Sequence, residues 1–129
     1  MDINEHLKKH YPADWREGEK YRYDSMLGGM LSYQGKATNI FPRIKCADGV
    51  SLSVQGHYGA YSRPRDDFAE TYLLVEVGYI EDAKEEPMAP PESWREHADG
   101  DFPSSIYGYV PVRLVEEFID AHGGLEPLP

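Results

Sequence analysis

The segment that most constrains the fold runs from residue 44 to residue 55 and reads IKCADGVSLSVQ. Two short apolar and β-branched runs flank Asp48 and Gly49, which is typical of a β-hairpin. A loop of these two residues alone would mix apolar and polar side chains on both faces of the ribbon. A three-residue loop with Gly49 in the left-handed region removes this conflict and predicts a hairpin over 43–55. The expected pairs are Cys46 with Val50 and Ile44 with Leu52.

Two further strands are predicted downstream. Residues 71 to 79 alternate, so that one face is expected to hold Leu73, Val75, Val77 and Tyr79. Leu74 on the opposite face predicts a strand that is covered partly on both sides, which favours a central position in the sheet. The last strand is expected over 105–110, where Ile106, Gly108 and Val110 alternate with Tyr107 and Tyr109.

A C-terminal helix is predicted over 111–122. Pro111 suits the first helical position because its missing N–H would have no partner there, and Gly123 suits the helix stop. The expected buried stripe is Val115, Phe118, Ile119 and His122. Antiparallel strands followed by one helix predict an α+β fold with a sheet of three to five strands.

The first forty residues are expected to form a partly helical N-terminal extension, with residues 41–129 as a single core domain. Asp2 followed by Glu5 is typical of a helix N-terminus, and this helix is expected to reach about Tyr11. A second helix is predicted from Ala13 toward Leu31, with a break at Gly28 and Gly29, and residues 32–39 are expected to form a loop.

Length and cysteine content indicate a single intracellular domain. The chain has 129 residues and one cysteine, Cys46, which is expected to be a buried small apolar group. No apolar run is long enough to span a membrane, and the N-terminus does not read as a secretory signal. We expect the protein in the cytoplasm.

The charge is distributed unevenly along the chain. Residues 1–65 carry a balance of +3 and residues 66–129 a balance of −13, giving a net charge of −10. Like charge repels phosphate, so direct binding of nucleic acid to the C-terminal half is not expected. A basic protein surface is the more suitable partner.

Eight of the sixteen acidic residues of 66–129 lie in a proline-rich segment that we call the acidic tract, residues 81–101. No packed strand is expected here, and a short helix after Pro91 with Trp94 as its anchor is predicted. Two interpretations are open: a solvated surface, or spaced carboxylates that imitate the phosphates of a nucleic acid and bind a basic groove. The candidate partner-binding residues are Glu81, Asp82, Glu85, Glu86, Glu92, Glu96, Asp99 and Asp101.

Catalytic and cofactor signals are weak, and no enzyme activity, cofactor or metal is predicted. Cys46, Asp48 and His57 are disfavoured as a catalytic set because Cys46 is expected in the core and Asp48 in a turn. His97, Asp99 and Asp101 do not match a calcium loop, and neither Gly-Gly pair matches a phosphate-binding loop.

The loop over 56–67 is expected to be exposed. Its part from His57 to Arg65 has two interpretations: its arginines bind an anion, or they pair with Asp66, Asp67 or Glu70.

Five spaced motifs resemble a group of small acidic proteins encoded in bacteriophages and prophages. They are KCADG with SVQ at 45–55, YSRPR at 61–65, VEVG at 75–78, YGYVP at 107–111 and HGG at 122–124. The resemblance covers residues 44–124, and the first forty residues depart from it. It implies a phage source and no catalytic residues. Small acidic phage proteins without an active site are often inhibitors of host defence, anti-CRISPR proteins among them.

The leading expectation is therefore a non-catalytic phage inhibitor that binds a basic surface of a host nuclease or other nucleic-acid-binding complex. One alternative is an accessory or structural phage protein whose acidity only confers solubility. A second alternative is a small enzyme that uses the His57–Arg65 loop.

Overall fold

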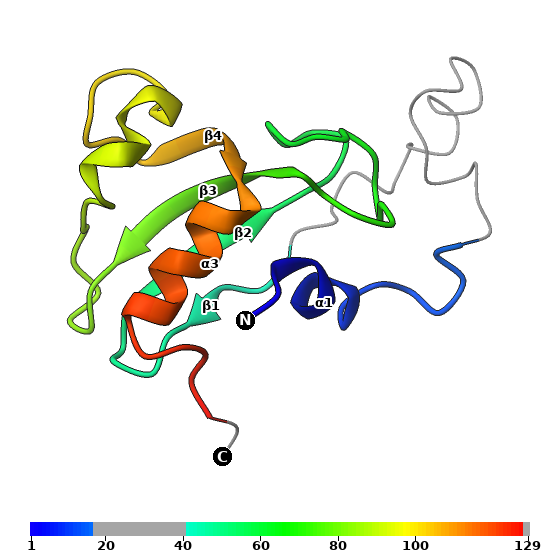
Figure 1. Ribbon diagram of the computed structural model, residues 1–129, viewed down its shortest axis with the longest axis horizontal. Helices are drawn as coiled ribbons and strands as arrows, with labels where there is room; N and C mark the ends of the chain where they lie inside the picture. The colour runs from blue at the N-terminus through cyan, green and yellow to red at the C-terminus, as the bar shows by residue number, and fades with distance from the viewer. Residues whose placement is uncertain (17–40, 128–129) are drawn as a thin grey trace.

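The computed structural model describes residues 1–16 and 41–127, which form the predicted α+β fold (Figure 1). One sheet holds four antiparallel strands in the order β1-β2-β3-β4, so each strand pairs with the next one along the chain. Helix α3 crosses one face of this sheet, and α1 contacts α3. The elements are α1 (Ile3–Lys8), β1 (Ile44–Lys45), β2 (Ser51–Gln55), β3 (Leu74–Glu81), the 3₁₀ helix η2 (Glu92–His97), β4 (Ile106–Pro111) and α3 (Val112–Ala121).

The central hairpin has the predicted register. Ile44 pairs with Leu52, and the Cys46 amide donates to the Val50 carbonyl at 2.7 Å. Gly49 has a φ of +95°, as the three-residue loop requires. Because Ile44, Cys46, Val50 and Leu52 are all buried, the ribbon gives one apolar face to the core.

Strand β3 is central, as predicted, because it pairs with both β2 and β4. Val75 and Val77 are fully buried as expected, but placing Leu73 and Tyr79 on the same face is wrong: they are 67% and 58% exposed. Leu73 precedes the strand, and Tyr79 lies in a β-bulge with a φ of +52°. The bulge shifts the alternation by one residue, so Ile80 takes the next core position.

A second bulge lies in β4, and the strict alternation predicted for this strand is wrong. Tyr107 and Val110 are both buried in the core, although alternation would place them on opposite faces. Between them, Gly108 and Tyr109 together oppose a single residue of β3. Tyr109 has a φ of +53°, close to that of Tyr79. Both bulges therefore occur at a Gly-Tyr sequence with a left-handed tyrosine.

Helix α3 covers the core face of the sheet. Its predicted stripe is present: Val115, Phe118 and Ile119 are buried, and the His122 side chain at its end is 21% exposed. Gly123 follows with a φ of +91° and ends the helix as predicted. The Gly124 amide donates to the carbonyl of Ile119 at 2.9 Å, which satisfies one of the last helical carbonyls.

Trp94 anchors η2 to the core, as predicted for a short helix after Pro91. Its side chain is 1% exposed. The ring centroid lies 5.8 Å from that of Tyr107 and 5.6 Å from that of Phe118. Trp94 thus joins η2 to both β4 and α3.

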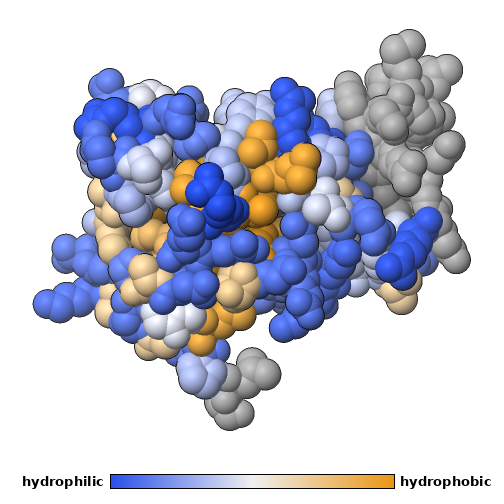
Figure 2. Space-filling model, in the orientation of Figure 1, coloured by the Kyte–Doolittle hydropathy of each residue, from blue (hydrophilic) through white to orange (hydrophobic). Residues whose placement is uncertain are grey.

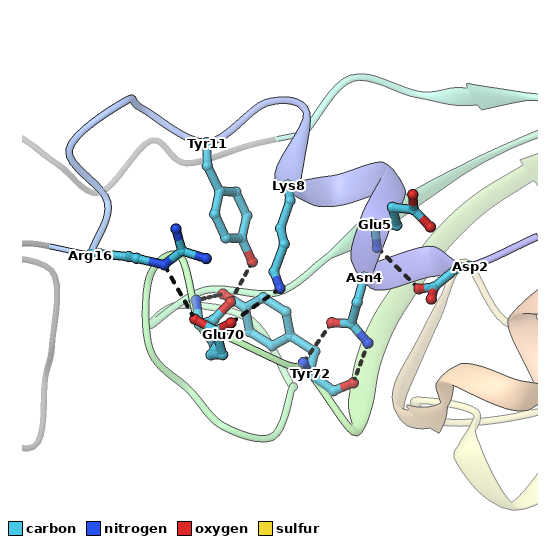
Figure 3. A network of polar contacts seen from close by, with 9 residues as sticks. Asp2, Asn4, Glu5, Lys8, Tyr11, Arg16, Glu70 and Tyr72 are labelled. Atoms are coloured by element: carbon cyan, nitrogen blue, oxygen red, sulfur yellow. Dashed lines mark hydrogen bonds and ion pairs between the residues drawn. The ribbon is translucent and has the colours of Figure 1, made fainter.

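Residues 1–16 pack against the core. Asp2 accepts the Glu5 amide at 3.0 Å, which confirms the predicted N-cap, but α1 ends at Lys8 and does not reach Tyr11. Ile3 and Leu7 are buried. The Asn4 amide group exchanges two hydrogen bonds with the backbone of Tyr72, at 2.9 and 2.6 Å (Figure 3).

The prediction that the whole of 56–67 is exposed is wrong. Ala60, Ser62 and Asp67 are between 0 and 2% exposed. The Tyr72 ring packs so closely on Gly56 that a Cβ there would lie 2.8 Å from it. The loop is therefore held against the core.

Several predictions for the N-terminal extension lie outside the described residues: the break at Gly28 and Gly29, the loop over 32–39 and the boundary at residue 40. Most of the second helix predicted over 13–31 also lies outside them. Within the described ranges, every helix is too short or too polar to cross a lipid bilayer.

Candidate functional site

The acidic tract forms two turns at the same side of the molecule, at the lower and upper left of Figure 1. The first turn follows β3: the Asp82 amide donates to the Glu86 carbonyl at 2.9 Å, and Glu85 has a φ of +64°. The second follows η2, and there the Asp99 amide donates to the Ile106 carbonyl at 2.9 Å. In Figure 2, hydrophilic residues occupy these two areas, with more hydrophobic residues between them.

Some of the eight carboxylates already have partners within the chain. Glu81 lies 3.5 Å from Arg43, Glu92 is paired with Arg95, and Glu96 lies 3.7 Å from His97. The Arg95 side-chain hydrogen bond lowers the pKa of Glu92. The arginines partly neutralise Glu81 and Glu92, and the third carboxylate has a histidine beside it.

Asp82 has a structural role in the first turn. Its Oδ1 atom accepts the amides of Lys84 and Glu86 at 2.8 and 3.1 Å. Backbone amides that would otherwise point at solvent are thus satisfied, which stabilises the loop that carries Glu85 and Glu86.

The other four candidate residues are exposed, and among the described residues their carboxylates form no hydrogen bond or ion pair: Glu85, Glu86, Asp99 and Asp101. The sequence therefore correctly predicted that the acidic tract lies at the surface. It could not show which of the eight carboxylates have partners within the chain and which do not.

Tyr79 lies between the two turns. It is 58% exposed and lines a groove of about 250 Å³ together with Glu81 and Pro87 from the first turn and Pro103 and Ser104 beyond the second. The left-handed backbone of Tyr79 turns its ring out of the core, where strand alternation would have placed it. An exposed aromatic ring therefore lies between two groups of carboxylates.

The arginines of the His57–Arg65 loop do not pair with the carboxylates proposed from the sequence. Glu70 instead lies 3.5 Å from Lys8 and 3.8 Å from Arg16 (Figure 3). Arg63 lies over the ring of Tyr109, at 5.3 Å, and Arg65 over the ring of Tyr61, at 5.9 Å. Among the described residues, no carboxylate forms an ion pair with either arginine.

Cys46, Asp48 and His57 have separate partners. Cys46 is buried, and burial raises the pKa of its thiol to about 11. Asp48 lies 2.7 Å from His122, and the Nδ1 atom of His57 accepts the Gly59 amide at 3.0 Å. Burial, and then the charge of Arg65, lower the pKa of His57. These contacts do not join the three residues into a catalytic unit.

The histidines and carboxylates offer no assembled metal site within residues 1–16 and 41–127, where no group of three or more potential ligands comes together. His97 contacts Glu96 as described above. His6 and His10, whose four-residue spacing was not among the predicted candidates, have ring centroids 5.6 Å apart. Two histidines without a further ligand fall short of a structural zinc site.

Comparison of the chain with protein-family models, with curated proteins and with solved structures finds no match. The resemblance of residues 44–124 to small acidic phage proteins therefore stays a prediction.

Proposed function

We propose that the protein is a phage-encoded inhibitor of a host defence or nucleic-acid-processing complex. It acts without catalysis, by binding a basic surface of that complex in the cytoplasm of the host. The observation that carries this proposal is the group of four exposed carboxylates at the two turns that have no partner among the described residues: Glu85, Glu86, Asp99 and Asp101.

Coulomb attraction to lysine and arginine side chains of a partner is available to these carboxylates because no cation within residues 1–16 and 41–127 pairs with them. Charged groups at the rim of an interface mainly increase the association rate and set the orientation of the partners. Affinity usually comes from a few buried aromatic anchors. Tyr79 has the position of such an anchor, between the two turns and beside a groove.

The proposal is tested by capture from bacterial lysate with three forms of the full chain. The first is the natural protein, and the second carries Glu85→Gln, Glu86→Gln, Asp99→Asn and Asp101→Asn. The third is a matched control that removes four exposed carboxylates elsewhere, through Glu5→Gln, Glu70→Gln, Glu117→Gln and Glu126→Gln.

The proposal requires that the natural and control proteins retain the same nucleic-acid-binding complex and that the tract variant loses it. The purified complex should then be inhibited by the natural protein, with binding that weakens as salt rises from about 50 to 500 mM, since exposed charges are screened. Equal retention by all three forms, or none, would instead support an accessory protein whose acidity only confers solubility.

A further inference from the structure

A second surface, separate from Tyr79, is built around the rings of Tyr61 and Tyr109. A groove of about 390 Å³ opens there. It lies where the loop before β3 and strand β4 meet η2 and the residues that follow it. The loop before β3 contributes Tyr61 to its lining, and β4 contributes Gly108 and Tyr109. Glu96 and His97 of η2 and the following Asp99 also line it.

The two rings are held in place by the backbone. Their centroids are 5.8 Å apart with an angle of 32° between the planes. The Tyr109 amide donates to the Tyr61 carbonyl at 2.9 Å, and the Tyr61 amide donates to Glu76 at 2.8 Å. A Cβ on Gly108 would lie 3.1 Å from the Cβ of Tyr61, so glycine is what allows this close approach. The aromatic surface is therefore formed before any ligand arrives.

The guanidinium groups of Arg63 and Arg65 lie over these two rings, next to the groove but not in its lining. Both side chains are exposed. The Arg63 amide donates to the Leu74 carbonyl at 2.9 Å, and the Leu74 amide donates to the Arg63 carbonyl at 3.3 Å. The Arg65 Nε atom donates to the Tyr58 carbonyl at 3.2 Å. Two arginines without a carboxylate partner among the described residues, on an anchored loop, suit the recognition of phosphate.

The lining of the groove itself includes two carboxylates. Glu96 and Asp99 are exposed there. Carboxylates accept hydrogen bonds from the exocyclic amino groups of nucleobases. A ligand that suits both the groove and the two neighbouring arginines is thus planar and carries an amino group and a phosphate.

We propose that this groove binds a nucleotide with an amino-bearing base, such as adenine or cytosine. The base packs on Tyr61 and Tyr109, and its amino group donates to Glu96 or Asp99. The phosphate accepts from Arg63 and Arg65. Aromatic rings and guanidinium planes are the groups on which proteins stack unpaired bases. The ligand is either a free nucleotide or one nucleotide of a single strand. The site does not depend on the proposed inhibitor function.

The test is a calorimetric titration of the full chain with AMP, CMP, UMP, adenosine and inorganic phosphate. AMP and CMP should bind more tightly than UMP, whose base lacks the amino group, and AMP more tightly than adenosine. Arg63→Gln with Arg65→Gln should weaken AMP binding at least about tenfold, because two charge-assisted hydrogen bonds are lost. Both arginines are exposed, so the variant should remain folded.

A matched control, Lys45→Gln with Arg113→Gln, removes the same charge from exposed positions that lie over neither tyrosine ring, and it should bind AMP like the natural protein. A short single-stranded oligoadenylate that binds more tightly than AMP identifies a strand as the ligand, and equal affinity identifies the free nucleotide. No binding of AMP or oligoadenylate at millimolar concentration, or equal AMP binding by the arginine variant, would overturn the proposal.

Discussion

The Nδ1 atom of His122 lies 2.7 Å from Oδ2 of Asp48, which joins the end of α3 to the turn of the central hairpin. Backbone bonds reinforce this contact: the Asp48 amide donates to the His122 carbonyl at 3.3 Å, and the Ala47 amide donates to Gly124 at 2.9 Å. Two local signals in the sequence, a hairpin turn and a helix stop, are therefore bonded to each other in the fold.

This contact predicts a loss of stability in acid that depends on Asp48. Its pKa is lowered first by the hydrogen bond from the Val50 amide and then by His122. A carboxyl group with a lowered pKa stabilises the fold above its ordinary value of 3.8 and loses that contribution as the pH falls through the folded-state pKa. Asp48→Asn should therefore have a lower Tm at pH 6 and a flatter decline of Tm between about pH 4 and pH 2. Circular dichroism melting curves measure both.

Asp101→Asn is the control for the acid prediction because Asp101 is exposed in a turn. It should follow the pH profile of the natural protein. If Asp48→Asn also followed that profile, the contacts of the Asp48 carboxylate with Val50 and His122 would not contribute to the stability in acid.

The left-handed backbone of Tyr79 predicts an unusual order of stability among its variants. Glycine adopts a φ of +52° without a Cβ clash, whereas alanine has a Cβ atom and keeps the clash. Tyr79→Gly should therefore be more stable than Tyr79→Ala by about 1 kcal/mol, although glycine is normally the less favourable residue in a strand. Urea unfolding measures the difference in the free energy of unfolding. The opposite order would mean that the bulge is absent in solution.

Cys46 should be unreactive in the folded protein. Its thiol is fully buried, and a pKa of about 11 in place of 9.0 leaves about a hundredfold less thiolate at pH 8. Reaction with a thiol-specific disulfide reagent should be slower than in urea by more than that factor. Equal rates in buffer and in urea would contradict the burial of this residue.

Trp94 should contribute more to stability than any residue of the acidic turns. Trp94→Ala leaves a cavity between η2, Tyr107 and Phe118 and should cost about 3–5 kcal/mol of the free energy of unfolding. Trp94→Phe keeps part of the contact and should cost less. Losses below about 1 kcal/mol for Trp94→Ala would mean that η2 is not anchored to the core.

Local interactions explain which predictions were confirmed. The register of the hairpin depends on residues at most eight positions apart, as Ile44 pairs with Leu52. The buried stripe of α3 depends on helical spacing alone, and Gly123 ends the helix through its own φ of +91°. Each of these features was therefore predictable from the sequence.

Contacts between distant segments decided the rest. The left-handed conformations of Tyr79 and Tyr109 are unfavourable locally and occur because pairing with neighbouring strands compensates for them, so alternation alone placed the wrong residues in the core.

The sequence by itself determined the fold class, the hairpin and the acidic surface. Only the tertiary structure decided which carboxylates have internal partners and which side chains lie beside Arg63 and Arg65. Acidic residues nearby in the sequence suggested ion pairs for these arginines. Instead, backbone hydrogen bonds join the loop to β3 and β4, and both guanidinium groups lie over tyrosine rings as a result. The sequence thus indicated an anion site for the arginines of the His57–Arg65 loop but not the candidate nucleotide groove, because the groove is lined by segments that meet only in the folded chain.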